Sequence, residues 1–273
     1  MLKTRIATAL TLLLLFLLAL FLLPTLGWAA LIVILVLQGA VEWGHLAKLS
    51  ARHIKVYGWI TLAIMLSLIW ADTYHPVYFE PLHLLVYALS AALWLLLVPI
   101  CLIRGSRINH PLLMALVGWA ALIPTGLAMM DLRTYSPWLL LGLMGLVWMA
   151  DIAAYFSGRK FGKNKLAPSI SPGKTWEGVA GALVGVTVYV LLINHFSDVP
   201  LTYKPLPIVL LLSWFWVALA VLGDLFESAI KRQAGVKDSG ALLPGHGGLL
   251  DRVDALTSTL PLAALVLLIQ SMV

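Results

Sequence analysis

Charged residues are scarce in this chain of 273 residues. Asp, Glu, Lys and Arg make up 11% of it, whereas they make up about 25% of a typical soluble domain. Hydrophobic residues make up 62%, and the mean hydropathy is +0.98. No aqueous core could bury that much apolar surface, which excludes an ordinary soluble globular protein. The composition predicts a protein embedded in a lipid bilayer.

Cysteine is almost absent as well. The single cysteine, Cys101, lies in an apolar run. A disulfide framework within the chain and a zinc site built from cysteines are therefore excluded. The basic balance, 18 Lys and Arg against 12 Asp and Glu, is typical of membrane proteins with positive cytoplasmic loops, and we expect no nucleic-acid partner.

Apolar runs long enough to cross the hydrocarbon core occur nine times. A helix needs roughly 20 apolar residues for this, and the first run is too long for the apolar region of a signal peptide. The sequence predicts an all-α, polytopic integral membrane protein with a single domain over 1–273, with five spans in 1–136 and four in 137–273. The predicted spans are 6–23, 27–46, 56–71, 81–103, 111–130, 137–156, 176–195, 206–229 and 255–272.

The basic residues predict how the chain is oriented. Cytoplasmic loops retain Lys and Arg, whereas translocated loops rarely do. With nine spans, all of the 18 Lys and Arg residues except Arg133 and Lys204 fall on one side. We therefore expect a cytoplasmic N-terminus. Two long loops on that side, 157–175 and 230–254, are expected to carry the function.

Five acidic residues lie inside predicted spans: Glu42, Asp151, Glu177, Asp224 and Glu227. A carboxylate at the bilayer centre costs at least ~2.5 kcal/mol, so intramembrane acids are functional candidates. The predicted topology puts all five near the cytoplasmic ends of their helices, where they would converge. For Glu42 and Glu227, simple pairing with Lys or Arg at the interface is an equally good interpretation.

The loop 230–254 combines glycines with basic residues. Its five glycines would let backbone N–H groups turn towards an anion, although a flexible solvated turn is the alternative. Asp251 and Asp254 are spaced i, i+3, so a helix start could present both to one cation, with Asp224 as a third ligand. His246, flanked by glycines, is a candidate for substrate or acid–base contact.

The loop 157–175 contains Gly173-Lys174-Thr175, but a phosphate-binding P-loop would need a glycine where Pro168 stands, and we expect no strand before it. A helix start with Thr175 as its N-cap and Lys174 beside it would still be an anion site. The glycines that follow, at 178, 181 and 185, are expected to allow close helix packing.

Both loops contain extended motifs. Upstream stand Tyr155, Gly158, Arg159 and Gly162, then Ser171-Pro172-x-Lys174-Thr175-x-Glu177-Gly178 and Gly223-Asp224. Downstream stand Ser228-x-Ile230-Lys231-Arg232, Lys237-Asp238-x-Gly240, Leu243-Pro244-x-His246-Gly247-Gly248 and Asp251-Arg252-Val253-Asp254.

This set of motifs resembles the signature of the phosphatidate cytidylyltransferases, also called CDP-diacylglycerol synthases. The resemblance covers residues 151–254, and one departure is Ile152-Ala153, where the family pattern has Thr-Gly or Ser-Gly. It implies a Mg²⁺-dependent nucleotidyltransferase of phospholipid biosynthesis that converts CTP and phosphatidate into CDP-diacylglycerol and pyrophosphate. It also implies a multi-pass protein of the inner (plasma) membrane with its site facing the cytoplasm. K⁺ is a candidate second ion, and a homodimer is a candidate assembly.

The expected site residues follow from the motifs. The catalytic groups would be Asp224, Asp251, Lys231, Arg232 and His246; the substrate-binding groups Ser171, Lys174, Thr175, Glu177, Ser228, Lys237, Asp238, Gly247, Gly248 and Arg252; and the metal ligands Asp224, Asp251 and Asp254.

Three other functions are alternatives for a membrane protein of this kind. A transporter would show an inverted repeat and polar groups near the bilayer midplane, and neither is visible in the sequence. A CDP-alcohol phosphotransferase would carry a spaced pattern of Ala-Arg, Gly and Asp residues that this chain lacks. A dolichol kinase-like enzyme that uses CTP would transfer the γ-phosphoryl group instead.

The predicted topology can be tested by fusion to alkaline phosphatase, which is active only when it is translocated. A fusion after Val273 should be active in a bacterial host, whereas one near Lys163 should be inactive. The opposite pattern would place the two basic loops on the translocated side of the membrane and contradict the predicted topology.

Overall fold

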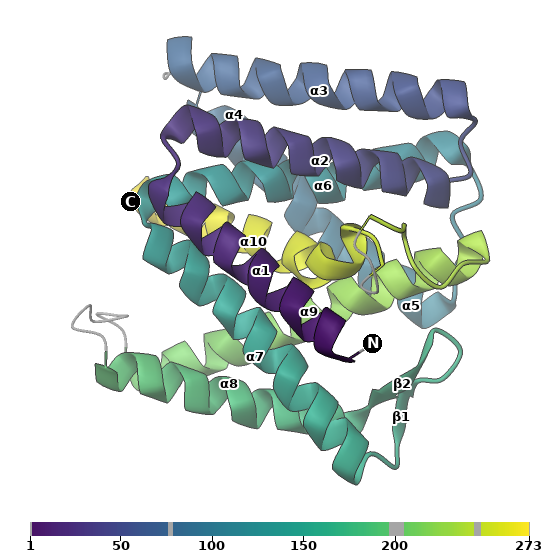
Figure 1. Ribbon diagram of the computed structural model, residues 1–273, viewed down its shortest axis with the longest axis vertical. Helices are drawn as coiled ribbons and strands as arrows, with labels where there is room; N and C mark the ends of the chain where they lie inside the picture. The colour runs from purple at the N-terminus through teal and green to yellow at the C-terminus, as the bar shows by residue number, and fades with distance from the viewer. Residues whose placement is uncertain (1, 76–78, 197–204, 243–246, 273) are drawn as a thin grey trace.

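The computed structural model describes residues 2–75, 79–196, 205–242 and 247–272 (Figure 1). Each of the nine predicted spans is helical, which confirms the all-α prediction for the membrane part. The helices are α1 (Leu2–Leu22), α2 (Thr25–Leu46), α3 (Ala51–Tyr74), α4 (Phe79–Ala92), α5 (Val98–Arg104), α6 (Pro111–Tyr135), α7 (Pro137–Phe161), α8 (Trp176–Phe196), α9 (Leu206–Ala234) and α10 (Leu250–Ser271). A π-helical turn at Leu93–Leu97 joins α4 to α5, and the three together form one span.

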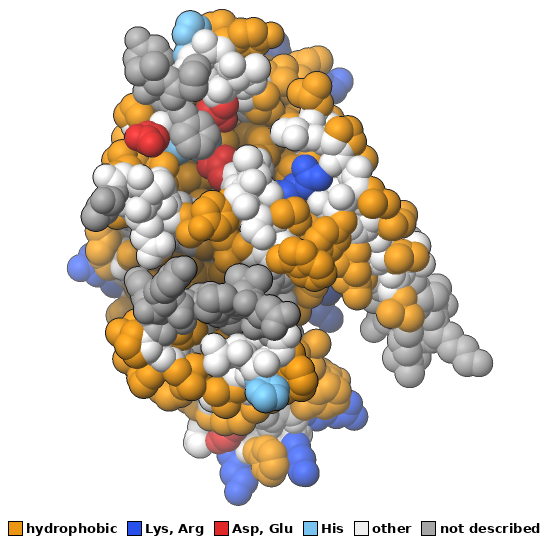
Figure 2. Space-filling model, turned by 90° about the vertical axis from the view of Figure 1, so that its left-hand side faces the viewer, with side chains coloured by type: hydrophobic (Ala, Val, Ile, Leu, Met, Phe, Trp, Pro, Cys, Tyr) orange, Lys and Arg blue, Asp and Glu red, His pale blue; other side chains and the backbone are white. Residues whose placement is uncertain are grey.

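Eight helical spans in the described part of the chain are long and apolar enough to cross a bilayer, and α1 adds the shorter apolar stretch Leu10–Leu22. Large apolar side chains stay exposed on the outer helix faces, among them Leu26, Trp59 and Val184. The end of the bundle seen in Figure 2 is mixed instead, with Asp, Glu and His side chains among the hydrophobic ones. The apolar outer faces of the helices are therefore the surface that meets the bilayer. Lipid tails are the solvent that suits this surface, so the protein is a polytopic membrane protein.

Helix α10 lies in the middle of the bundle. It packs against α9, α6 and α4, and it also touches α7 and α2 (Figure 1). Its neighbour α6 has the largest buried share of the eight spans. Leu260 of α10 and Leu127 of α6 are fully buried. Helix α10, whose start carries the last motif, therefore contacts helices from both halves of the chain.

The helices α7 and α8 approach closely through small residues. A Cβ added to Gly181 would collide with Ser157, and one added to Gly185 would lie 2.5 Å from the Cβ of Ala153. Close backbone approach is what small residues allow in helix pairs within membranes. This confirms the predicted packing role of these glycines and fixes α7 against α8.

A short β-hairpin corrects one expectation. Lys165–Ala167 (β1) pairs antiparallel with Ser171–Thr175 (β2), so two strands lie where the sequence predicts only a loop. The hairpin joins the end of α7 to the start of α8. The predicted N-cap is confirmed, because the Thr175 hydroxyl accepts a hydrogen bond from the N–H of Gly178 at 3.1 Å.

The opposite end of the bundle contains a buried histidine. The side chain of His83 has no exposed surface, and its ring nitrogens lie 2.7 Å from an oxygen of Asp131 and 3.0 Å from one of Asp72. The Tyr87 hydroxyl donates to the same Asp131 oxygen at 2.6 Å. These contacts join α3, α4 and α6 at the end away from the hairpin.

The polar motifs gather at one end of the bundle. The hairpin, the ends of α5 and α9 and the start of α8 lie on the right-hand side of Figure 1. The hairpin contacts α7, α8 and α9, and Arg232 of α9 donates to the carbonyl oxygen of Ile170 in the hairpin turn at 3.3 Å. The two loops that the sequence predicted to carry the function therefore meet.

The close contact between α9 and α10 can be tested at Gly223. A Cβ there would lie 2.6 Å from the Asp254 carbonyl oxygen and 3.1 Å from the Cα of Ala255, so backbone would have to move. We expect Gly223→Ala to lower the free energy of unfolding by roughly 1–3 kcal/mol, measured by denaturation in detergent micelles. Gly142→Ala is the control, because nothing lies within 4 Å of the added Cβ. Equal stability of both variants would contradict this packing.

Candidate active site

Lys231 is a buried cation at the junction of α9 and α10. Its ammonium lies 2.6 Å from Oδ1 of Asp251 and 3.1 Å from Oε1 of Glu227. The residue is only 8% exposed. Two acids and one lysine therefore share a space that excludes most water. Glu227 thus pairs with a lysine, and a functional role for that acid stays a prediction.

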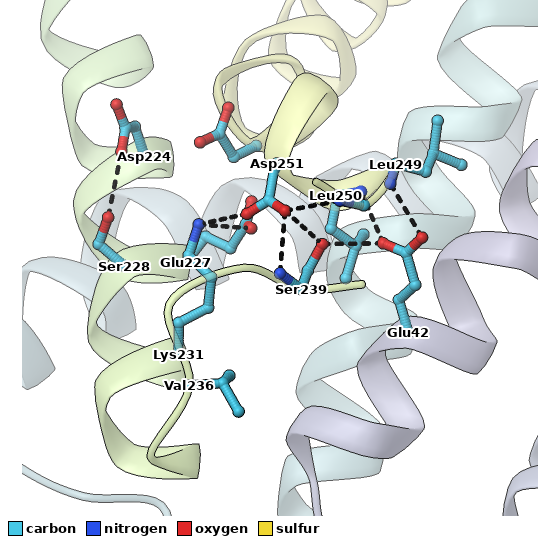
Figure 3. Close-up of polar contacts among 12 residues, drawn as sticks. Glu42, Asp224, Glu227, Ser228, Lys231, Val236, Ser239, Leu249, Leu250 and Asp251 are labelled. Atoms are coloured by element: carbon cyan, nitrogen blue, oxygen red, sulfur yellow. Dashed lines mark hydrogen bonds and ion pairs between the residues drawn. The ribbon is translucent and has the colours of Figure 1, made fainter. Parts of the chain in front are cut away.

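The second oxygen of Asp251 is held by the Gly-rich loop. It accepts hydrogen bonds from the Ser239 N–H at 2.9 Å, the Ser239 hydroxyl at 3.0 Å and the Gly248 N–H at 2.8 Å (Figure 3). Gly247 makes this turn with a left-handed backbone, at φ 81°. Protein donors thus surround both oxygens of Asp251.

Glu42 reaches the same loop from α2. Its carboxylate accepts from the N–H groups of Leu249 and Leu250 at 2.9 and 3.0 Å and from the Ser239 hydroxyl at 2.9 Å (Figure 3). In the described part of the chain, no Lys or Arg pairs with it. The interpretation in which Glu42 pairs with Lys or Arg is therefore wrong as far as the described part of the chain shows.

Asp224 lies apart from this network, as Figure 3 shows. Its Oδ2 lies 2.5 Å from the ammonium of Lys174 in the hairpin, and its Oδ1 accepts from the Ser228 hydroxyl at 3.3 Å. The side chain of Asp224 is 31% exposed, and that of Lys174 is 23% exposed. The pair connects α9 to β2 and stays accessible to a ligand.

Two further carboxylates surround Asp224. Asp151 of α7 and Asp254 of α10 lie within electrostatic reach of it, and Lys174 and Lys231 offset part of their combined negative charge. Such oxygen donors fit Mg²⁺, which usually takes one or two carboxylates together with substrate phosphates. Among the residues that the structure describes, no three His, Cys, Asp or Glu side chains lie close enough to form a metal site by themselves.

The predicted metal set joined Asp224 and Asp254 to Asp251. Asp251 differs from the other two, because Lys231, Ser239 and Gly248 occupy its oxygens. Its role as a metal ligand stays a prediction, and it would require those donors to move.

A cavity of about 470 Å³ opens beside Asp224, between α7, α8, α9 and the hairpin. Its apolar wall includes Val179, Val217 and Val221. Its polar lining comes from Asp151, Tyr155, Arg159, Ser171, Lys174, Thr175 and Asp224. The cavity can hold a molecule that has an apolar part and an anionic part.

Several predicted site residues support the scaffold in this structure. Thr175 is buried and caps α8, while Glu177 accepts from the backbone N–H of Asn164 at 3.1 Å and from its side chain at 2.8 Å. Arg232 bonds the carbonyl oxygens of Ile170 and Val236. These contacts hold the hairpin against α8 and α9.

The remaining predicted residues lie in or next to the Gly-rich loop, except Ser228, which lies on α9 beside Asp224. Lys237, Asp238 and Arg252 are exposed, whereas Gly248 is buried and Ser228 is 8% exposed. His246 lies outside the described residues.

Sequence reasoning missed Ser239, which joins Glu42 to Asp251. It occupies an unassigned position of the motif, directly after Asp238, and no local pattern marks a hydroxyl that bonds across 197 positions. The sequence marks Glu42 and Asp151 as intramembrane acids but does not assign them to the site. The signal that could have assigned them is that each is an isolated acid in a run of apolar residues.

The sequence of this chain is similar to known proteins over nearly its whole length. The sequence profile described as "Cytidylyltransferase family" matches residues 3–270. A phosphatidate cytidylyltransferase of Haemophilus influenzae is 39% identical over 280 residues, which covers 96% of both chains. One from Pseudomonas aeruginosa is 38% identical over 277 residues, which covers 98% of this chain and 97% of the relative.

A phosphatidate cytidylyltransferase of Bacillus subtilis is 46% identical over 116 residues, which is 42% of each chain. The first two matches extend far beyond the motifs, into the five N-terminal spans. The resemblance found in the motifs is therefore confirmed over nearly the whole sequence, and the chain belongs to the cytidylyltransferase family.

Proposed function

We propose that this protein is a phosphatidate cytidylyltransferase, a nucleotidyltransferase that converts CTP and phosphatidate into CDP-diacylglycerol and pyrophosphate. Relatives that carry this name match it over nearly their full length. Phospholipid biosynthesis is the process that such an activity serves.

The cavity beside Lys174 is the observation in this structure that best supports the proposal. One side is walled by aliphatic residues of α8 and α9, and the other carries an ammonium, a guanidinium and carboxylates. A lipid phosphate would place its glycerol and first acyl carbons against Val179 and Val217, with its phosphate near Lys174. CTP would bring its triphosphate to the same polar side, where the hairpin meets α9.

The chemistry would be an in-line displacement. An oxygen of the phosphatidate phosphate attacks the α-phosphorus of CTP, the bond to the β-phosphate breaks, and pyrophosphate leaves with the electron pair. The protein mainly positions the two anions and stabilises the charge on the equatorial oxygens. Lys174 and Arg232 are the cations of the hairpin junction that would contact phosphate, and no covalent protein intermediate is needed.

Lys231 has a different role in this proposal. It donates one hydrogen bond to Asp251 at 2.6 Å and lies 3.1 Å from the carboxylate of Glu227. It would mainly hold Asp251 in place, because two carboxylates already compete for its charge.

Mg²⁺ is the proposed cofactor, with Asp224 and Asp254 as its protein ligands and Asp151 next to them. When bound, it would neutralise phosphate charge in the transition state. K⁺ as a second ion and a homodimeric assembly stay predictions.

The site would face the cytoplasm. The end of the bundle that carries the motifs also carries the basic residues of the hairpin and of the end of α9, and positive charge favours the cytoplasmic side. CTP is dissolved in the cytosol and phosphatidate stays in the leaflet, so the reaction belongs at their boundary.

The transferred group can be identified with labelled CTP. With purified protein and phosphatidate, label at the α-phosphorus should enter the lipid, and label at the γ-phosphorus should appear in pyrophosphate. Counting both labels in the lipid extract measures this. A γ-label in the lipid would indicate a kinase and contradict the proposal.

Asp224 tests the metal part of the proposal. Asp224→Asn keeps the size and one oxygen but removes the charge, so we expect turnover to fall roughly 100-fold and the Mg²⁺ titration to shift to higher concentration. Chelation of Mg²⁺ should abolish turnover of the unmodified protein.

Glu80→Gln is the control for Asp224→Asn, because Glu80 is exposed and lies at the start of α4, away from the motifs. A normal Mg²⁺ titration in Asp224→Asn would remove Asp224 from the metal site. An equal loss of turnover in Asp224→Asn and Glu80→Gln would mean that removal of any negative charge lowers turnover, wherever that charge lies.

A further inference from the structure

Glu42 is a buried acid in the half of the chain that contains none of the motifs. It is 3% exposed, and its partners in the Gly-rich loop and α10 lie 197 to 208 positions away in sequence. An unpaired carboxylate in such a place costs several kcal/mol, so its retention calls for a specific set of donors.

The structure supplies four donors. Oε1 accepts from the Gln38 side-chain amide at 3.0 Å and from the Leu249 N–H at 2.9 Å. Oε2 accepts from the Leu250 N–H at 3.0 Å and from the Ser239 hydroxyl at 2.9 Å. The first N–H groups of a helix lack partners within the helix, and the helix dipole favours a negative charge beside them. Glu42 therefore caps α10 from another helix.

Ser239 connects this cap to Asp251. Its N–H and its hydroxyl both approach Oδ2 of Asp251, at 2.9 and 3.0 Å. Because a hydroxyl has a single proton, the two carboxylates share one donor, and a shift of either acid changes the hydrogen bond of the other. No spare room exists there, since a Cβ on Gly248 would collide with the Ser239 hydroxyl and with Oε2 of Glu42.

We propose that Glu42 is a positioning residue of the transferase site. It holds the two ends of the Gly-rich loop, at Ser239 and at Leu249–Leu250, and thereby keeps Asp251 against Lys231 (Figure 3). Glu42 does not contact substrate in this role. The inference rests on the proposed function, because it assigns the consequence of the cap to that reaction.

Glu42→Gln tests the inference with the least change in shape. The variant keeps one acceptor oxygen but turns amide hydrogens towards backbone N–H groups. We expect kcat to fall about tenfold to a hundredfold with little change in KM for CTP. Hydrogen exchange should quicken at residues 239–242 and 247–251 and stay unchanged in α3 and α8.

Ser239→Ala is the second variant, in case Glu42→Gln does not fold. It leaves Glu42 in place and removes the shared hydroxyl, so we expect a loss of kcat in the same direction and faster exchange centred on the Ser239 turn. Glu80→Gln is the matched control and should change neither kcat nor exchange.

Two outcomes would overturn the inference. Faster exchange with unchanged kcat would make Glu42 a structural cap only, and a lower kcat with unchanged exchange would mean that Glu42 does not act through the loop. If the unmodified protein did not transfer the α-phosphoryl group, the proposed function would fail. The exchange measurement would still decide whether Glu42 holds the loop.

Discussion

The ion pair between Lys231 and Asp251 links the end of α9 to the start of α10 where little solvent reaches either charge. Removing both charges from water is costly, and their attraction offsets that cost only when further hydrogen bonds complete the arrangement. Ser239 and Gly248 supply those bonds to Asp251, and Glu227 places a second carboxylate 3.1 Å from the ammonium of Lys231. Loss of one partner would leave an uncompensated buried charge, so the geometry of the motif-bearing end depends on this pair.

The acids at this end divide into two groups with different chemistry. Glu42 and Asp251 are surrounded by protein donors, which suits a role in holding the loop. Asp224 is more accessible and lies beside a cavity, close to Asp151 and Asp254, which suits ligand and metal binding. A transporter would place such groups near the bilayer midplane, whereas here Asp224 pairs with Lys174 of the hairpin that joins α7 to α8.

The sequence allowed the helices to be predicted well, because a run of about 20 apolar residues has few alternatives in a bilayer. The helix ends were harder to predict. Helix α7 continues through Arg159 and Lys160 to Phe161, beyond the apolar run. The hairpin was not predicted, because strands of three and five residues, one of them Ser171-Pro172-Gly173-Lys174-Thr175, carry no apolar alternation.

The site was predicted as a set of residues, but their partners were not. The pairing of Lys174 with Asp224 crosses from a hairpin to a helix, and the bond from Ser239 to Glu42 crosses most of the chain. Such contacts depend on how helices are arranged around α10, which no local spacing encodes. Lys231, predicted as a catalytic group, proved to be enclosed by two acids for the same reason.

The cap on α10 has a consequence for biogenesis. Chains are synthesised from the N-terminus, so α2 enters the membrane well before the ribosome has made Ser239, Leu249 and Leu250. During that interval Glu42 lacks three of its four donors. The nascent helix must keep this carboxylate at the lipid–water boundary, and only the arrival of the last span converts it into an interior group.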